Sequence, residues 1–273
     1  MGEADKCLRS LQYSLEHPVY HGGSVRAVGT AYHAGLEHLY DHRIAGTTVT
    51  LDEIVRHAQQ RFTDSVEMVP SHESEHTKTA GEFRWDDKVP DHDTGLVLVA
   101  SMLRAYDANP EAEWPSDWEV LETEMGFSQP LWNSHTRNGS MDLVLRDPDG
   151  FICGEDHKTS SGNKWAYNKH HARKQNQSPW YVAALMCAYP DAPGYRFFYD
   201  IMTFKGVFER RESVVTREHV AAIEAKAVQV VTLYEGMRSA GIDLPANPAS
   251  NLCSPLYCDH WTICPYGQAL DVQ

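Results

Sequence analysis

Apolar residues in the first part of the chain recur every three or four positions, which is the period of one face of an α-helix. The pattern predicts helices over residues 24–43, 51–66 and 94–107. Ser24 precedes the first apolar position and is expected to cap the first of these helices. The polar stretch 68–93 lacks this period, so we expect a loop there.

The middle of the chain changes to shorter runs with partial alternation, which is typical of strands. Such runs cover residues 117–129, 139–146 and 151–158. The last two are separated by Asp-Pro-Asp-Gly at 147–150, a strong turn signal. Two strands joined by a tight turn form an antiparallel hairpin.

The remaining segments predict a helix over 169–188, a strand over 195–204, and a long helix that begins after Thr216 and ends near Gly241. The order of elements is helices, three strands, a helix, a strand and a helix. This order indicates an α/β or α+β domain with a central sheet.

The size and composition fit one globular domain with a large core. The chain has 273 residues, of which 42% are hydrophobic and 23% charged. We expect a single domain over residues 1–273, with a helical insertion at about 44–110. No apolar signal segment opens the chain, and no run nears the roughly 18 apolar residues of a membrane helix. These features predict a cytoplasmic protein with no membrane partner.

The net charge of −14 counts against a simple nucleic-acid coat protein, because phosphate contacts need cations. An acidic chain has to concentrate its cations locally, and the segment 164–174 does so without a single acidic residue. We expect its cations to contact a DNA backbone, although a solvated helix start explains the segment equally well. They are Lys164, Lys169, Arg173 and Lys174.

The predicted hairpin carries the most informative side chains. Asp142 lies on its first strand, and Asp156 and Lys158 lie two residues apart on its second. The two-residue period of a strand puts Asp156 and Lys158 on one face. Two converging carboxylates repel each other, so a cation is expected between them, and oxygen ligands suit Mg²⁺ or Mn²⁺. Such an ion acidifies water and stabilises charge on a phosphate, which Lys158 would help to neutralise.

The residues beside Asp156 have different expected roles. Alternation points the His157 side chain away from that face, but its backbone carbonyl is a candidate metal ligand. Glu155 is a rival for Asp156, and the same alternation puts it on the face opposite Lys158.

These residues resemble the motifs of the PD-(D/E)XK nuclease superfamily, and in detail those of its RecB-like branch. The resemblance is carried by residues in the order in which that branch places them, over nearly the whole chain. They are Gly29, His33 and Glu37 upstream, Glu124, Gly139 and Asp142, the run Asp156–His157–Lys158–Thr159, and Gln177 and Tyr181 downstream. Met141 stands where the superfamily's name has a proline, a position that varies within the branch.

The resemblance implies a restriction-endonuclease-like α/β core, with a central mixed sheet flanked by helices, and roles for particular residues. His33, Asp142 and Asp156 would bind the metal ion, Lys158 would be catalytic, and Gln177 and Tyr181 would support the site or the DNA. It further implies a Mg²⁺- or Mn²⁺-dependent DNA exonuclease acting on single strands or free ends. The implied setting is recombination, repair or phage DNA processing. A non-catalytic DNA-binding or assembly subunit with the same fold, and a zinc-stapled protein of unrelated activity, remain alternatives.

Cysteines form a second candidate site. Three lie near the C-terminus, with the spacing Cys253-x4-Cys258-x5-Cys264, and Cys7 lies near the N-terminus. Disulfides are rare in a reducing compartment, so such a group suggests a metal. Four thiolates suit structural zinc, and free buried cysteines are the plain alternative.

In RecB-like exonucleases, one N-terminal and three C-terminal cysteines hold a [4Fe–4S] cluster. The resemblance implies the same here, with residues 242–273 as a Cys-rich tail that packs with the N-terminus, although the first gap is two residues longer than usual. Such a cluster would pin the two ends of the chain together. We expect Cys153 and Cys187 to be packing residues of a strand and a helix.

Overall fold

The structure is a computed structural model. It describes residues 7–9, 12–13, 19–20, 23–67, 79–80, 83–132, 134–161, 177–247, 253, 258, 260 and 263–266. The chain divides into two compact units. One contains residues 23–67 and 85–224, and the other contains 1–22, 68–84 and 225–273.

The first of these units is built on a five-stranded sheet with the strand order β3-β4-β5-β6-β7. The β5–β6 pair is parallel and the other three pairs are antiparallel, so the sheet is mixed. This confirms the predicted central mixed sheet, including the antiparallel hairpin. The strands are β3 (Glu119–Trp132), β4 (His135–Arg146), β5 (Ile152–Ser160), β6 (Tyr195–Thr203) and β7 (Phe208–Glu212).

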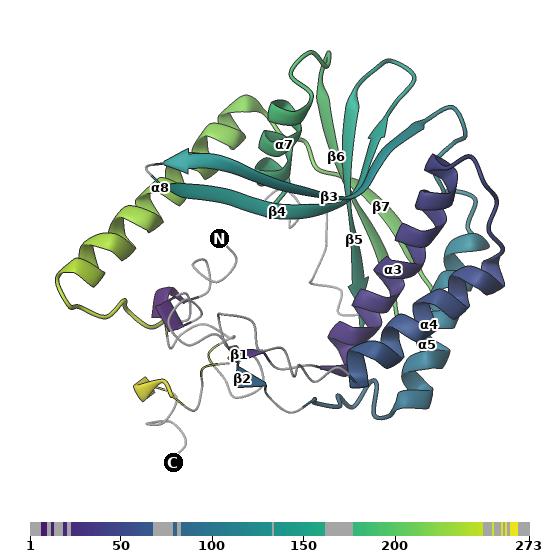
Figure 1. Cartoon of the computed structure of the whole chain (residues 1–273), viewed down its shortest axis with the longest axis horizontal. Coiled ribbons are helices and arrows are strands. Elements are labelled where there is room, and N and C mark those ends of the chain that lie inside the picture. The colour runs from purple at the N-terminus through teal and green to yellow at the C-terminus, as the bar shows by residue number, and fades with distance from the viewer. Residues whose placement is uncertain are drawn as a thin grey trace. The chain divides into compact units, whose positions relative to one another are not determined.

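Helices cover both faces of this sheet, because its strands are apolar on both sides. Consecutive residues Phe197 and Phe198 of β6 belong to different apolar clusters. Phe197 packs with Val182 and Leu185 of α7 (Gln177–Ala188), whereas Phe198 packs in a cluster that contains Tyr40 of α3 (Ser24–Ile44). Figure 1 shows α7 and α3 on different sides of the strands. This layering fits the restriction-endonuclease-like core that the sequence predicted.

The β4 and β5 strands pair only near their shared turn. Their register runs from Arg146–Ile152 to Leu143–Glu155. Beyond this point β4 continues along β3, and β5 continues along β6, so the two strands diverge (Figure 1). Asp142 and Asp156 are the first residues past the last pair. The divergence therefore opens the sheet at the predicted carboxylates.

Three helices pack together on the Tyr40 side: α3, α4 (Leu51–Glu67) and α5 (His92–Asp107). Thr50 and Glu53 form a capping box at the start of α4, with Glu53 Oε2 accepting from the Thr50 backbone N–H at 2.9 Å. Asp91 caps α5 through Thr94. The expectation for Ser24 was wrong: Gly23 is the N-cap of α3, and Ser24 Oγ instead accepts from the Asp86 backbone N–H.

β7 differs from the sequence-based prediction. It was not predicted, because its run Phe-Glu-Arg-Arg-Glu carries four charges, which is typical of an exposed edge strand. It follows a turn at Gly206, whose φ of 75° favours glycine. α8 (Arg217–Ser239) begins after Thr216 as predicted, and Glu224 in its first half accepts a 2.7 Å hydrogen bond from Arg137 of β4.

The second unit brings segments from both ends of the chain together. β1 (Val19–Tyr20) pairs in parallel with β2 (Thr79–Ala80). Arg9 forms a 2.5 Å ion pair with Asp243, and Gln12 accepts a 2.8 Å hydrogen bond from the Leu244 backbone N–H. No helix in the described part of the chain combines the length and apolar character that crossing a membrane needs.

Candidate active site

Asp142 lies where β4 leaves β5. Its Oδ2 accepts a 2.6 Å hydrogen bond from the backbone N–H of His157, and His33 Nδ1 lies 3.4 Å from the same oxygen. The Asp142 side chain is 12% exposed. Burial alone would raise its pKa, but the His33 and His157 contacts prevail and lower the pKa to about 2. Asp142 therefore presents a carboxylate, not a carboxylic acid, at neutral pH.

Asp156 and Lys158 share one face of β5, and the Lys158 amine forms an ion pair with Asp156 Oδ2. Gln177 Nε2 donates to the other oxygen, Oδ1, at 2.9 Å. Burial raises the pKa of Asp156, and the Asp142 carboxylate adds to this while Lys158 opposes it. The carboxylate thus lies in a place where additional positive charge would be favourable.

His33 reaches the carboxylates from α3 because that helix passes very close to β5. A Cβ atom on Gly29, one turn before His33, would lie 2.9 Å from Thr159 Oγ1. With a larger residue at this position, either the Thr159 side chain or the helix would have to shift. Burial lowers the pKa of His33, but its hydrogen bond to Asp142 outweighs this and raises the pKa above the usual value.

Gln177 and Tyr181 reach the site from the first turns of α7. Gln177 Nε2 donates to Tyr181 Oη at 2.9 Å as well as to Asp156. The Tyr181 ring packs against Phe127 and Phe197, with centroid distances of 5.8 and 5.5 Å. Burial raises the pKa of Tyr181 to about 12, so its hydroxyl keeps its proton. The structure thus brings His33, Asp142, Asp156, Lys158, Gln177 and Tyr181 together.

The His157 side chain lies on the opposite face of β5, in a buried polar network. Its Nδ1 is 3.0 Å from Glu155 Oε1. Glu155 also accepts from the Trp114 indole, and Arg210 Nη2 lies 4.0 Å from its Oε2. Arg210 binds Asp200 through two hydrogen bonds of 2.7 and 2.5 Å.

Within the described part of the chain, one trio of side chains brings potential metal-ligand atoms within 4.8 Å of one another, namely Glu155, His157 and Asp200. Burial raises the pKa of both carboxyl groups. The Arg210 guanidinium already supplies a positive charge between them. We therefore interpret the trio as a structural network behind the site.

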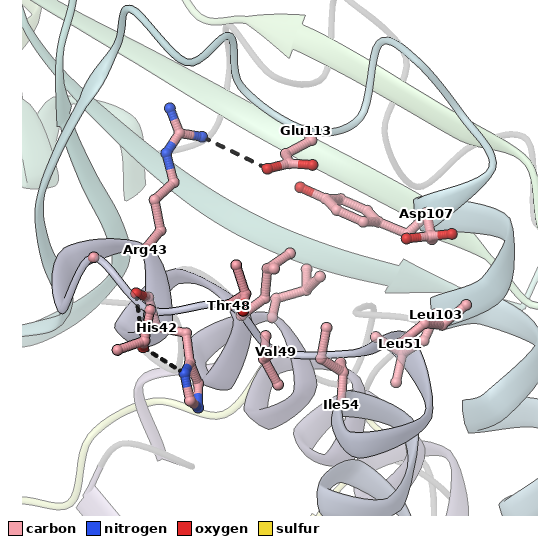
Figure 2. Close-up of a pocket in the computed structure, with 14 residues that line it drawn as sticks. His42, Arg43, Thr48, Val49, Leu51, Ile54, Leu103, Asp107 and Glu113 are labelled. Carbon is pink, nitrogen blue, oxygen red and sulfur yellow. Dashed lines mark hydrogen bonds and ion pairs between the residues drawn. The ribbon is translucent and has the colours of Figure 1, made fainter.

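A cavity of about 450 Å³ lies elsewhere in this unit, between α3, α4 and α5 (Figure 2). Its lining is apolar at Leu36, Ile54 and Leu103, and Arg43 and Glu113 form an ion pair of 3.9 Å at its edge. It contains none of the predicted catalytic residues. The catalytic candidates thus lie at the divergence of the strands and not in this cavity.

A comparison with protein-family models shows which superfamily the chain belongs to. Residues 8–265 match the model of the PD-(D/E)XK nuclease superfamily. The chain belongs to this superfamily. Asp142 and the Asp156–His157–Lys158 run lie within the matched residues.

Other comparisons add only distant likenesses for this nuclease-superfamily chain. No curated protein matches it. A candidate exonuclease from Eubacterium rectale is 12% identical, with a TM-score of 0.43, over 81% of this chain and 73% of the other. The crystal structure of SSO0001 is 15% identical, with a TM-score of 0.36, over 94% of both chains.

Residues of the buried network were missed at the sequence level. Asp200 stands alone as an acid within the otherwise apolar core of β6, and that was an available signal of a buried, paired carboxylate. Arg210 gave no such signal, because it lies among other charged residues in β7. The proposed DNA contacts Lys164, Lys169, Arg173 and Lys174 lie outside the described residues.

The four predicted cluster cysteines all belong to the second unit, and none forms a disulfide. Burial raises the pKa of Cys258, and the charges of Cys264, Cys253 and Cys7 raise it further. The same holds for Cys253 beside Cys7 and Cys264. Cys7 and Cys264 therefore lie close enough to act on Cys253 and Cys258, although the four cysteines come from both ends of the chain.

The two other cysteines differ from each other. Cys153 is fully buried in the apolar cluster on the Tyr40 side, as expected for a packing residue. The same expectation was wrong for Cys187, which is exposed in the last turn of α7. Its Sγ lies 3.8 Å from Arg137 Nη2.

Proposed function

We propose that this superfamily member is a Mg²⁺- or Mn²⁺-dependent deoxyribonuclease that hydrolyses phosphodiester bonds. The observation that supports this most strongly is the grouping of Asp142, Asp156 and Lys158 at the divergence of β4 and β5, with His33 3.4 Å from Asp142. A dead remnant of the fold would have no need for two buried carboxylates and an amine at one point.

The side chains present fit a divalent ion. Asp142 and Asp156 supply carboxylate oxygens, the ligands that Mg²⁺ and Mn²⁺ prefer, and their side chains are only 12% and 5% exposed. His33 offers an imidazole nitrogen beside Asp142. Together with the backbone carbonyl of His157, these groups would hold the ion. The ion would acidify water and neutralise charge on the phosphate.

The remaining residues have distinct positioning tasks. Lys158 would place its positive charge beside the phosphate oxygens as negative charge builds up on them. Gln177 fixes the orientation of Asp156 through its 2.9 Å hydrogen bond, and Tyr181 fixes Gln177. The His157 N–H fixes Asp142.

The finer parts of the proposal come from the resemblance to the RecB-like branch. We infer action as an exonuclease on single strands or free ends, in recombination, repair or phage DNA processing. The cations of the 164–174 segment would track the DNA backbone on the way to α7.

The deciding experiment is digestion of labelled DNA with Mn²⁺ or Mg²⁺. End-labelled linear DNA, both single- and double-stranded, is compared with covalently closed circles. Native protein should release end nucleotides and spare the circles, and Lys158→Ala should not cleave. Lys205→Ala, which removes an exposed lysine from the β6–β7 turn, is the matched control. Failure of the native protein to cleave any substrate would support a non-catalytic binding or assembly subunit instead.

We also propose that Cys7, Cys253, Cys258 and Cys264 hold a [4Fe–4S] cluster. The closeness of Cys7 and Cys264 to Cys253 and Cys258, which shows in their effect on the pKa of those two thiols, supports a shared ligand. Four thiolates would also satisfy tetrahedral Zn²⁺, with Zn–S bonds of about 2.3 Å. The choice of a [4Fe–4S] cluster therefore comes from the resemblance to the RecB-like branch. Iron analysis and absorbance near 400 nm of anaerobically purified protein test this assignment.

A further inference from the structure

Three histidines meet on the surface of α3 and α4, away from the carboxylates of the nuclease site. The His38 and His57 rings stack with centroids 4.4 Å apart and an interplanar angle of 8°. The His38 and His42 rings meet edge to face at 4.8 Å. The three side chains line a hollow of about 530 Å³ together with Glu53.

The positions of these residues on their helices match a metal site built by two facing helices. His38 and His42 are four residues apart on α3, and Glu53 and His57 are four residues apart on α4. Each pair therefore points to one side of its helix. The spacing His-x3-His is also within the range that zinc ligands use. Two such pairs on adjacent helices can supply four ligands to one ion.

The hollow is lined by charges of both signs, since Arg56 lies there with Glu53 and the three histidines. Arg56 is exposed, so its guanidinium can extend into solvent when a cation binds beside Glu53. Glu53 lies close enough to act on the charge of His38 and to feel that of His42. Its Oε2 caps α4 through Thr50, so a metal ion would bind the other carboxylate oxygen, Oε1.

We propose that His38, His42, Glu53 and His57 form a second metal site, which takes Zn²⁺. Three imidazoles and one carboxylate form a borderline donor set, which suits Zn²⁺ better than Mg²⁺ or Mn²⁺. The site would tie α3 to α4, and α3 is the helix that carries His33. This inference does not depend on the proposed nuclease activity.

Binding requires a rearrangement of side chains. The His38 and His57 rings stack instead of converging on one point. The potential ligand atoms of the four residues are not all within 4.8 Å of one another; among the described residues, only Glu155, His157 and Asp200 meet this distance. His57 is exposed and His42 half-buried. Rotation of such side chains is fast, so the backbone of α3 and α4 can stay in place.

The test counts Zn²⁺ ions and measures their affinity by calorimetry and metal analysis. The cysteines and the carboxylate site can also take Zn²⁺, so the informative quantity is a difference between proteins. His42→Gln and His57→Gln are compared with native protein. His219→Gln is the matched control, because it removes an exposed histidine from α8 and a glutamine keeps the capping box with Thr216.

The native protein and the His219→Gln control should bind one more Zn²⁺ ion than either test variant. Even outer-shell changes cost about 10–100-fold in metal affinity, so loss of a ligand should cost at least about 100-fold. Zn²⁺ should raise the melting temperature of the native protein more than that of His57→Gln. Equal stoichiometry and affinity in all four proteins would overturn the proposal, as would an equal loss in His219→Gln. Circular dichroism of the metal-free variants shows whether they fold. If only one of His42→Gln and His57→Gln folds, that variant alone decides the test.

Discussion

The backbone N–H of His157 donates a 2.6 Å hydrogen bond to Oδ2 of Asp142. β4 has already left β5 at this point, so a carboxylate takes the place that a strand carbonyl would have in a continued ladder. This one hydrogen bond satisfies the backbone N–H of His157 and fixes the position of the Asp142 carboxylate. It also links the geometry of the sheet directly to the candidate metal site.

Replacement of either carboxylate or of the lysine should abolish efficient cleavage. We expect Asp142→Ala, Asp156→Ala and Lys158→Ala each to lower kcat at least about a hundredfold, the scale of losing a main catalytic group. Single-turnover cleavage of labelled DNA with saturating Mn²⁺ measures this, with Lys205→Ala as the control. Near-native cleavage by any one variant would remove that residue from the mechanism.

The core of this site was predictable because a hairpin is a local structure. The turn at 147–150 sets the register, and the two-residue period puts Asp156 and Lys158 on one face and Glu155 on the other. The structure has this arrangement, since Glu155 contacts Trp114 and His157, whereas Lys158 pairs with Asp156. Local pattern was sufficient for these side-chain directions.

The divergence of β4 from β5 was not predictable in the same way. It arises because β4 pairs with β3 as far as Trp132–His135, while β5 pairs with β6 as far as Ser160–Thr203. These are long-range pairings, and no local run of residues encodes where one strand leaves another. The charged strand β7 and its Arg210 were missed for a related reason, since only tertiary contacts show which of its charges are buried.

Metal binding should depend on pH through His33. Its pKa is raised above the usual value of 6.5, so below that pKa a proton has to leave before the ring can bind an ion. We therefore compare the slope of log Mn²⁺ affinity against pH in the native protein and in His33→Gln. Below the pKa of His33, this slope should be larger by one in the native protein. Proton release from Asp156 contributes to the slope in both proteins, so the difference between the two slopes reports on His33 alone. Calorimetric titrations between about pH 5.5 and 8 measure it, and parallel slopes would contradict a ligand role for His33.

Gln177 and Tyr181 should act by orienting Asp156. Gln177→Leu removes both hydrogen bonds and should lower activity by about 10–100-fold, as for other groups that orient a metal ligand. Tyr181→Phe keeps the ring packed on Phe127 and Phe197 and should have a smaller effect, with an unchanged melting temperature. Cleavage rates and thermal melts of the two variants test this order. An unchanged rate in Gln177→Leu would show that Asp156 does not need its hydrogen bond.

The cysteine cluster should act as a staple between the ends of the chain. Loss of the cluster in Cys258→Ala would release a loop of nearly the whole chain, and by analogy with disulfides this is worth roughly 5 kcal/mol. We expect loss of iron and a markedly lower melting temperature. Cys187→Ala is the matched control, because Cys187 is exposed and lies in the other unit. Unchanged iron content and melting temperature in Cys258→Ala would exclude this role.

Two adjacent arginines of β7 should differ greatly in their contribution to stability. Arg210 binds Asp200, which is 2% exposed, and also donates a 2.7 Å hydrogen bond to the backbone carbonyl of Ala112. Its guanidinium lies 3.6 Å from the centroid of a Trp114 ring. Arg210→Met would leave buried carboxylates without their counter-charge, which should cost about 3–5 kcal/mol.

Arg211→Met is the matched comparison on the next position of the same strand. Arg211 pairs with Glu209, whose side chain is 54% exposed, so water replaces the lost partner. The cost should stay below about 1 kcal/mol. Urea unfolding of the two variants measures both values. A similar small loss in both would show that Glu155 and Asp200 do not depend on Arg210, and that the network behind the site is held by Trp114 and His157 alone.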